Sequence, residues 1–122
     1  NIKALKEFFE SDIFRRIKSS NTVEREMRFL TEVNATQIDP TLPKEYENEK
    51  VVIQGAVDVC FIEDDEIVIL DFKTDRNDDP KAFVDAYSEQ LNIYAIACEK
   101  IFKKAVKEKI IYSFSLGVEI QV

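Results

Sequence analysis

Apolar and polar positions divide this chain into alternating helical and extended segments. Apolar side chains recur every three or four positions over Ile2–Lys18, which predicts one amphipathic helix. Residues Thr22–Val33 alternate loosely between apolar and charged side chains and predict a strand. The polar stretch Asn34–Asn48 contains Pro40 and Pro43 and predicts a loop.

Two β-branched runs follow, separated by an acidic turn. Val51–Ile62 and Ile67–Phe72 predict strands, and Glu63–Glu66 between them predicts the turn of a hairpin. We expect the turn to be centred between Asp64 and Asp65, and a loop of two or of four residues gives the same strand register.

The last third of the chain predicts a long helix and further strands. Residues 77–80 (N-D-D-P) combine an acidic cap with a proline suited to a first helical turn, so a helix is expected from there to about Phe102. Ala105–Phe114 predicts a strand and Val118–Val122 a possible last one, with Gly117 at the turn between them. The predicted order is α-β-β-β-α-β, with room for one more strand.

The expected hairpin register places two carboxylates opposite each other. Asp58 and Asp71 face each other across the strands, and directly opposed side chains have Cβ atoms roughly 5 Å apart. Such a pair needs a cation between its members or a shared proton. Lys73 lies two residues beyond Asp71 and therefore on the same strand face. Two carboxylates and an ammonium on one face indicate a site for metal-assisted hydrolysis.

The predicted long helix carries a second set of candidate residues. Its seam steps by four and three positions through Phe83, Tyr87, Gln90, Tyr94, Ala97 and Ile101. Gln90 and Tyr94 lie one turn apart and can act together. Taken alone, they are read more simply as a hydrogen-bonded core amide and a core tyrosine.

Length and composition indicate one globular domain over residues 1–122. The hydrophobic content of 45% is ordinary, and no run of about 18 apolar residues predicts a transmembrane helix. Cys60 and Cys98 fall in predicted secondary structure and read as core residues of a reduced, cytoplasmic protein. Asn1 is not an initiator methionine, so we interpret the chain as a piece of a longer protein.

Charge and missing residue types narrow the chemistry. The net charge of −7 is unusual for a nucleic-acid enzyme, so a DNA path must be local or supplied by neighbouring domains. The chain contains no histidine, which excludes a histidine base or ligand within it. No C-x-x-C motif is present for a zinc knuckle or an iron–sulfur cluster.

Four motifs, in order, resemble the RecB-like branch of the PD-(D/E)XK nuclease superfamily. Residues 25–29 (R-E-M-R-F) resemble its R-E-hydrophobic-P-F strand, with Arg28 in place of the usual proline. Residues 55–58 (G-A-V-D) resemble G-x-x-D, and residues 71–75 (D-F-K-T-D) resemble D-[YF]-K-[TS]-D. Residues 87–94 (Y-S-E-Q-L-N-I-Y) resemble the helical Q-x-x-x-Y motif. Within the branch, the chain looks most like the C-terminal nuclease domain of AddA-type helicase–nucleases.

The resemblance implies a restriction-endonuclease-like α/β core, with a central mixed sheet flanked by helices, and a set of residue roles. Asp58, Asp71 and the Phe72 carbonyl would bind Mg²⁺ or Mn²⁺, for which oxygen ligands are suited. Lys73 would orient water or the phosphate. Two further roles are implied: Gln90 and Tyr94 would brace the site and approach the DNA backbone, and Glu26 would act in a second shell or at a secondary metal.

One family feature is missing from the chain. The RecB-like branch carries a further histidine ligand in an upstream G-x-x-x-H helix, and no histidine occurs here. We expect the isolated chain to lack one ligand and to cleave DNA poorly or not at all.

Simpler structural interpretations exist for the other charged groups. Asp71 and Lys73 could form a plain pair at a strand end, with Asp58 capping a turn. The acidic turn reads as solvated, and Asp75, Asp78 and Asp79 as loop and helix-cap residues. A basic cluster reads as solvated surface, or alternatively as a DNA or partner contact: Lys100, Lys103, Lys104, Lys107 and Lys109.

Three functions remain open from the sequence. The first is the exonuclease domain of a bacterial helicase–nuclease in double-strand break repair and recombination, working on DNA with a helicase domain of the same polypeptide and a second subunit. The second is an inactive nuclease-fold module that docks DNA or a partner subunit. The third is a stand-alone RecB-like exonuclease. None of the three involves a membrane.

Overall fold

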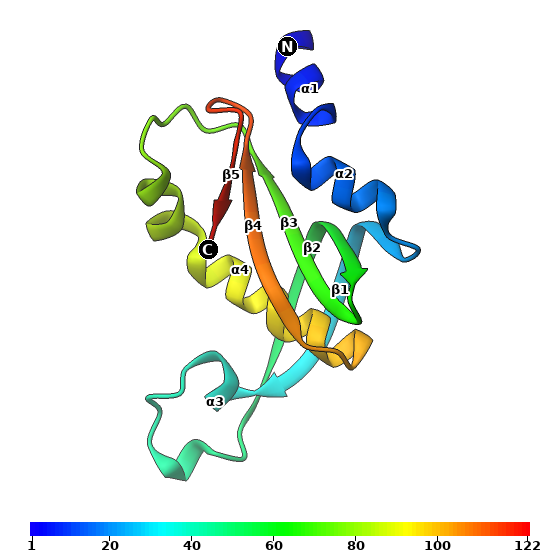
Figure 1. The fold of residues 1–122 in the computed structure, drawn as a ribbon. Coiled ribbons are helices and arrows are strands. Elements are labelled where there is room, and N and C mark those ends of the chain that lie inside the picture. Colours follow the sequence, from blue (N-terminus) through cyan, green and yellow to red (C-terminus); the bar gives the residue numbers. More distant parts are fainter.

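The computed structural model describes residues 1–122, which form five strands, four α-helices and one short 3₁₀ turn (Figure 1). In chain order these are α1 Ile2–Phe9, α2 Asp12–Ser19, β1 Val23–Asn34, α3 Ala35–Ile38, η1 Lys44–Tyr46, β2 Lys50–Glu63, β3 Glu66–Lys73, α4 Pro80–Phe102, β4 Val106–Ser113 and β5 Val118–Gln121.

The strands form one mixed sheet in the order β1-β2-β3-β4-β5. Neighbours are antiparallel except for β3 and β4, which are parallel and joined by α4 as the crossover helix. This arrangement confirms the predicted α-β-β-β-α-β order, the mixed sheet and the additional last strand. Gly117 sits in the turn before β5 with a left-handed φ of 67°, as the sequence predicted.

Two hydrophobic layers cover the two faces of the sheet. On one face, α4 packs Leu91 and Cys98 against strand residues such as Ile69 and Ile111. On the other, α1 and α2 contribute the smaller layer, which contains Phe8, Ile13, Ile17, Phe61, Leu70 and Tyr112. Both cysteines are free and buried in the α4 layer, in agreement with their interpretation as core residues.

The prediction of one helix over Ile2–Lys18 is wrong, because the chain breaks at Ser11 into α1 and α2. The Ser11 hydroxyl accepts a hydrogen bond from the Phe14 amide at 3.2 Å and so caps α2. The Ser11 amide donates to the Phe8 carbonyl at 2.9 Å. The break lets Phe8, Ile13 and Ile17 all bury against the sheet. Cap chemistry therefore overrides the continuous apolar periodicity.

The β2–β3 hairpin follows the predicted register. Pairing runs from Val59 opposite Leu70 to Glu63 opposite Glu66, around a two-residue turn. The φ angles of 53° at Asp64 and 64° at Asp65 indicate a type I′ turn, which suits short hairpins.

The acidic turn is not simply solvated, as its composition had suggested. The Lys104 ammonium lies 2.5 Å from an Asp65 oxygen, and the Lys107 ammonium lies 2.9 Å from a Glu63 oxygen. Part of the predicted basic cluster is thus paired with this turn, whereas Lys103 and Lys109 form no ion pair.

The long helix begins where predicted, with the Asp79 side chain accepting from the Lys81 amide at 3.0 Å. The predicted seam is only partly buried. Phe83 and Ala97 lie in the core, but Gln90 is exposed and the Ile101 side chain is 46% exposed. The loop predicted over Asn34–Asn48 is confirmed apart from the short α3 and η1 turns.

Candidate active site

At the position of Glu26 in β1 and Asp58 in β2, the side chains of both strands change the face of the sheet on which they lie. In β2, Val57 packs in the α4 layer, but Val59 packs in the layer of α1 and α2. In β1, Glu26 has a left-handed φ of 50° and drops out of the ladder between Arg25 and Met27. In a regular strand, residues two apart share a face. The irregular row therefore re-aims the side chains, and it is the row that carries Asp58.

This row is also where β2 leaves β3. Their ladder ends at Val59 opposite Leu70, and the β1–β2 ribbon continues past the sheet toward α3 (Figure 1). An Asp58 carboxylate oxygen accepts a hydrogen bond from the Phe72 amide at 2.8 Å. The carboxylate thus takes the place of a backbone acceptor at the point where the two strands separate.

Asp71 is a buried carboxylate, with 3% of its surface exposed. The Lys73 ammonium lies 2.8 Å from Asp71 Oδ2, but this oxygen makes no hydrogen bond of good geometry. The pKa of Asp71 is raised from 3.8 to about 6, because burial and, less strongly, the neighbouring Asp58 outweigh the opposing effect of Lys73. Asp58 and Asp71 are therefore neighbours, as the hairpin register predicted.

Lys73 projects from the end of β3 toward α4. Its ammonium donates a hydrogen bond to Gln90 Oε1 at 3.1 Å and lies 4.1 Å from the centre of the Tyr87 ring. The Tyr87 hydroxyl donates to an Asp75 carboxylate oxygen at 2.6 Å. The structure thus brings Gln90 to the acidic pair through Lys73.

Tyr94 lies one helical turn beyond Gln90, close to both acids. Burial is the largest cause that raises the pKa of the Tyr94 hydroxyl, and the negative charges of Asp71 and Asp58 raise it further. Its ring packs edge-on against Phe29, with centroids 5.9 Å apart.

Gly55 explains how Tyr94 can lie so close to β2. A Cβ atom at Gly55 would be 2.9 Å from Phe29 Cζ and 3.2 Å from Tyr94 Cε1. The glycine of the G-x-x-D motif therefore leaves room for the Phe29 ring and for Tyr94, which lies near the acidic pair.

The close approach at Gly55 predicts that Gly55→Ala destabilises the protein by about 1–3 kcal/mol, since overpacking a tightly packed position has this cost. Chemical denaturation measures the loss. Ala56→Val is the matched control, because Ala56 is exposed on the same strand and should tolerate added bulk. Equal stability of Gly55→Ala and the parent would show that Phe29 and Tyr94 move aside freely.

Glu26 is the candidate residue with the weakest link to the acidic pair of Asp58 and Asp71. It is exposed and shares a groove with Asp58, Arg25 and Phe72. No group of three or more His, Cys, Asp or Glu side chains that could hold a metal ion converges in the structure. The role of Glu26 therefore stays a prediction.

Tyr87 and Asp75 were not singled out for the site by the sequence. Both lie in stretches that resemble family motifs, but the sequence assigned Tyr87 only to an apolar seam and Asp75 only to a loop. The three-residue spacing between Tyr87 and Gln90, which places both on one side of α4, was the available signal.

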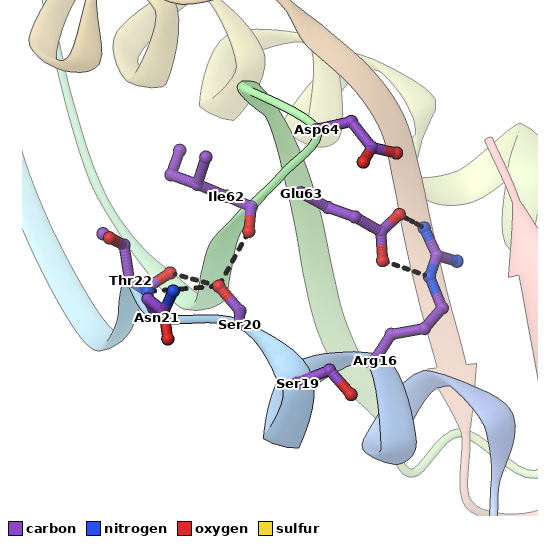
Figure 2. Close-up of a pocket in the computed structure, with 8 residues that line it drawn as sticks. All are labelled: Arg16, Ser19, Ser20, Asn21, Thr22, Ile62, Glu63 and Asp64. Atoms are coloured by element: carbon purple, nitrogen blue, oxygen red, sulfur yellow. Dashed lines mark hydrogen bonds and ion pairs between the residues drawn. The ribbon is translucent and has the colours of Figure 1, made fainter.

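A second pocket lies at the other end of the hairpin and is a structural junction (Figure 2). The Ser20 hydroxyl donates to the Ile62 carbonyl at 2.7 Å and accepts from the Thr22 amide at 3.2 Å. The Arg16 guanidinium binds both oxygens of Glu63, at 2.7 and 3.0 Å. The polar groups that line this pocket are largely hydrogen-bonded or ion-paired to one another, so we assign no chemistry to the pocket.

The acidic pair fits a hard divalent ion in donor type. Carboxylates and carbonyls are the ligands that Mg²⁺ and Mn²⁺ prefer. Asp71 Oδ2 is buried, and its ion partner is the Lys73 ammonium 2.8 Å away. Two carboxylates leave part of a coordination sphere to water, substrate or other groups.

None of the helices is both long and apolar enough to span a bilayer.

Comparison with known proteins agrees with this geometry. The model of the PD-(D/E)XK nuclease superfamily matches residues 3–120. Proteins named as ATP-dependent helicase/nuclease subunits are similar over nearly the whole chain. The one from Clostridium novyi (strain NT) is 41% identical over 94% of this chain, and the one from Clostridium perfringens (strain SM101 / Type A) is 38% identical over 100% of it. The one from Thermoanaerobacter sp. (strain X514) is 39% identical over 96%.

Each of these relatives is matched over 10% of its own length, so the chain spans about a tenth of them. The matched family and the fold agree with the motifs at Asp58, Asp71, Lys73, Gln90 and Tyr94. The chain belongs to the PD-(D/E)XK nuclease superfamily.

Proposed function

We propose that this chain is the nuclease domain of an ATP-dependent helicase–nuclease and hydrolyses DNA phosphodiester bonds with Mg²⁺ or Mn²⁺. The names of its relatives support the setting, and the site supports the chemistry. The observation that carries the proposal is the buried Asp71 carboxylate, which lies beside Asp58 and 2.8 Å from the Lys73 ammonium.

The residues of the site have separable roles in this proposal. Asp58, Asp71 and the carbonyl of Phe72 hold the ion, which when bound supplies positive charge to the phosphodiester and promotes ionisation of water. Lys73 adds a fixed positive charge that binds the phosphate or orients water. Gln90 holds Lys73 through the 3.1 Å hydrogen bond. Tyr94 borders the site on the α4 side and approaches the DNA backbone.

The acidic character of the chain fits a domain that receives DNA from elsewhere. A net charge of −7 gives little long-range attraction for a polyanion. A helicase domain in the same polypeptide, together with a second subunit, would deliver the strand to Asp58 and Asp71. We assign this assembly to double-strand break repair and recombination.

Calorimetric titration of Mn²⁺ into the chain and into Asp71→Ala tests the metal site. We expect binding by the parent and none by the variant, because the variant loses a ligand. A free Mn²⁺ concentration of 100 times Kd should also raise the free energy of unfolding of the parent by about 2.7 kcal/mol. Asp85→Ala is the control, since Asp85 is exposed on α4.

Cleavage is then measured in the full helicase–nuclease polypeptide, with the same two variants and single-stranded DNA. Metal-dependent cleavage that Asp71→Ala abolishes would establish the nuclease. If neither the chain nor the longer polypeptide binds Mn²⁺, the proposal is wrong and the domain is a docking module.

A further inference from the structure

We propose that Tyr87 and Asp75 form a positioning device for Lys73, in which the Tyr87 ring supports the ammonium and Asp75 fixes the ring. The consequence for catalysis rests on the nuclease function proposed above. The contact itself does not, so the two ideas can be tested separately.

Three groups from two elements determine where the Lys73 ammonium lies. Asp71 on the same strand is 2.8 Å away, Gln90 on α4 accepts a hydrogen bond at 3.1 Å, and the Tyr87 ring centre is 4.1 Å away. An ammonium over the face of a tyrosine within about 6 Å is attracted by the ring quadrupole. The Lys73 side chain is only 16% exposed, so water weakens these contacts little. Without the ring, the flexible four-carbon side chain would keep only its contacts to Asp71 and Gln90.

Tyr87 is itself held in place through its hydroxyl group. The hydroxyl donates to a carboxylate oxygen of Asp75, which lies in the loop between β3 and α4, at 2.6 Å. The backbone carbonyl of Asp75 accepts from the Ser115 hydroxyl at 2.7 Å, which fixes the loop to the β4–β5 turn. The Tyr87 hydroxyl is therefore anchored to the β3–α4 loop, while its ring faces Lys73.

This arrangement accounts for a tyrosine at position 87. A leucine would fill the same edge of α4 but offer no charge attraction, and a phenylalanine would offer the ring without its attachment to Asp75. A merely structural Tyr87 would need neither its closeness to Lys73 nor the hydrogen bond to Asp75.

Nuclear magnetic resonance of the chain with ¹³C-labelled lysine tests the contact without any activity. The ε-methylene protons of Lys73, assigned from their loss in Lys73→Arg, should be shifted upfield by the ring current of Tyr87. The shift should remain in Tyr87→Phe and vanish in Tyr87→Leu. An unshifted Lys73 signal in the parent, or an upfield shift that persists in Tyr87→Leu, would overturn the proposal. If Tyr87→Leu does not fold, Tyr87→Met takes its place with the same expectation.

Turnover in the helicase–nuclease polypeptide tests the consequence. We expect kcat to fall by about tenfold to a hundredfold in Tyr87→Leu with KM unchanged, because misplacing a group by about 1 Å can cost a hundredfold. Tyr87→Phe and Asp75→Ala should each lose about threefold, and Asp75→Asn, which keeps an acceptor oxygen, should recover most of that loss. The control is Tyr46→Leu, an exposed tyrosine in η1.

The outcomes separate the two ideas. A parental kcat in Tyr87→Leu, or an effect on KM alone, contradicts the positioning role. If the parent polypeptide cleaves nothing but the ring-current shift is present, the nuclease function fails while the Lys73–Tyr87 contact stands.

Discussion

Replacing Asp71 with asparagine should raise the melting temperature of the metal-free protein at pH 8, although it removes a proposed metal ligand. The reason is that burial and Asp58 disfavour the Asp71 carboxylate, whose pKa is raised from 3.8 to about 6. An amide carries no charge to bury. The net pKa shift already includes the attraction of Lys73, and burying the polar amide has a cost of its own, so we expect a gain of about 1–2 kcal/mol.

The gain from Asp71→Asn should disappear as the pH falls. Asp71 has a folded-state pKa of about 6 and an unfolded value near 3.8, so the folded protein takes up this proton more readily. The stability linked to the proton is fully present below pH 3.8 and is lost as the pH rises through 6. Thermal melts should therefore show a difference between variant and parent at pH 8 that shrinks toward pH 5.

Two comparisons make the Asp71→Asn result interpretable. Asp85→Asn removes an exposed carboxylate from α4 and should leave the melting temperature unchanged at both pH values. Saturating Mn²⁺ should reverse the order at pH 8, because it stabilises the parent and not the variant. A variant that melts below the parent at pH 8 without metal would mean that the Lys73 ion pair outweighs the cost of burial.

The sequence predicted those parts of the fold that depend on local signals. The centre of the hairpin turn at Asp64 and Asp65 fixed the register, and with it the proximity of Asp58 and Asp71. The acidic cap and Pro80 marked the start of α4. Each of these depends on a few neighbouring residues, so no tertiary information was needed.

Features that depend on distant contacts could not be predicted. The face reversal at Asp58 requires Glu26 to adopt a left-handed φ of 50°, which nothing in its side chain favours. Gln90 was placed in an apolar seam, whereas it is exposed and bound to Lys73, since the seam runs along the border of the helix–sheet contact.

Charge pairing across the sheet was missed for the same reason. Arg16 in α2 binds Glu63 at the end of β2 and Glu108 in β4, and Lys107 joins the group 2.9 Å from Glu63. These residues are separated by up to 92 positions along the chain. The sequence showed the acidic turn Glu63–Glu66 and the basic cluster of the last third of the chain only as two separate charged segments.

Replacing Arg16 with methionine should therefore destabilise the protein by about 2 kcal/mol, with a fall in melting temperature of roughly 5–10 °C. The Arg16 side chain is 14% exposed and makes a bidentate contact to Glu63. Without it, two neighbouring carboxylates keep only Lys107 as a cation. The loss is smaller than for a fully buried pair, because Glu63 is 28% exposed.

The pH dependence identifies the ion pair as the cause. Arg16, with a smaller contribution from Lys107, lowers the pKa of Glu63 from 4.5 to about 2, so the stability from these contacts is present above pH 4.5 and is lost as the pH falls through 2. The difference between Arg16→Met and the parent should shrink between pH 5 and pH 2. Arg15→Met is a matched control from the same helix, since the side chains of its Asp12 pair are 69% and 60% exposed. Such exposed pairs contribute at most about 1 kcal/mol. If both variants lost the same stability at every pH, the three-element network around Arg16 would contribute no more than a surface contact.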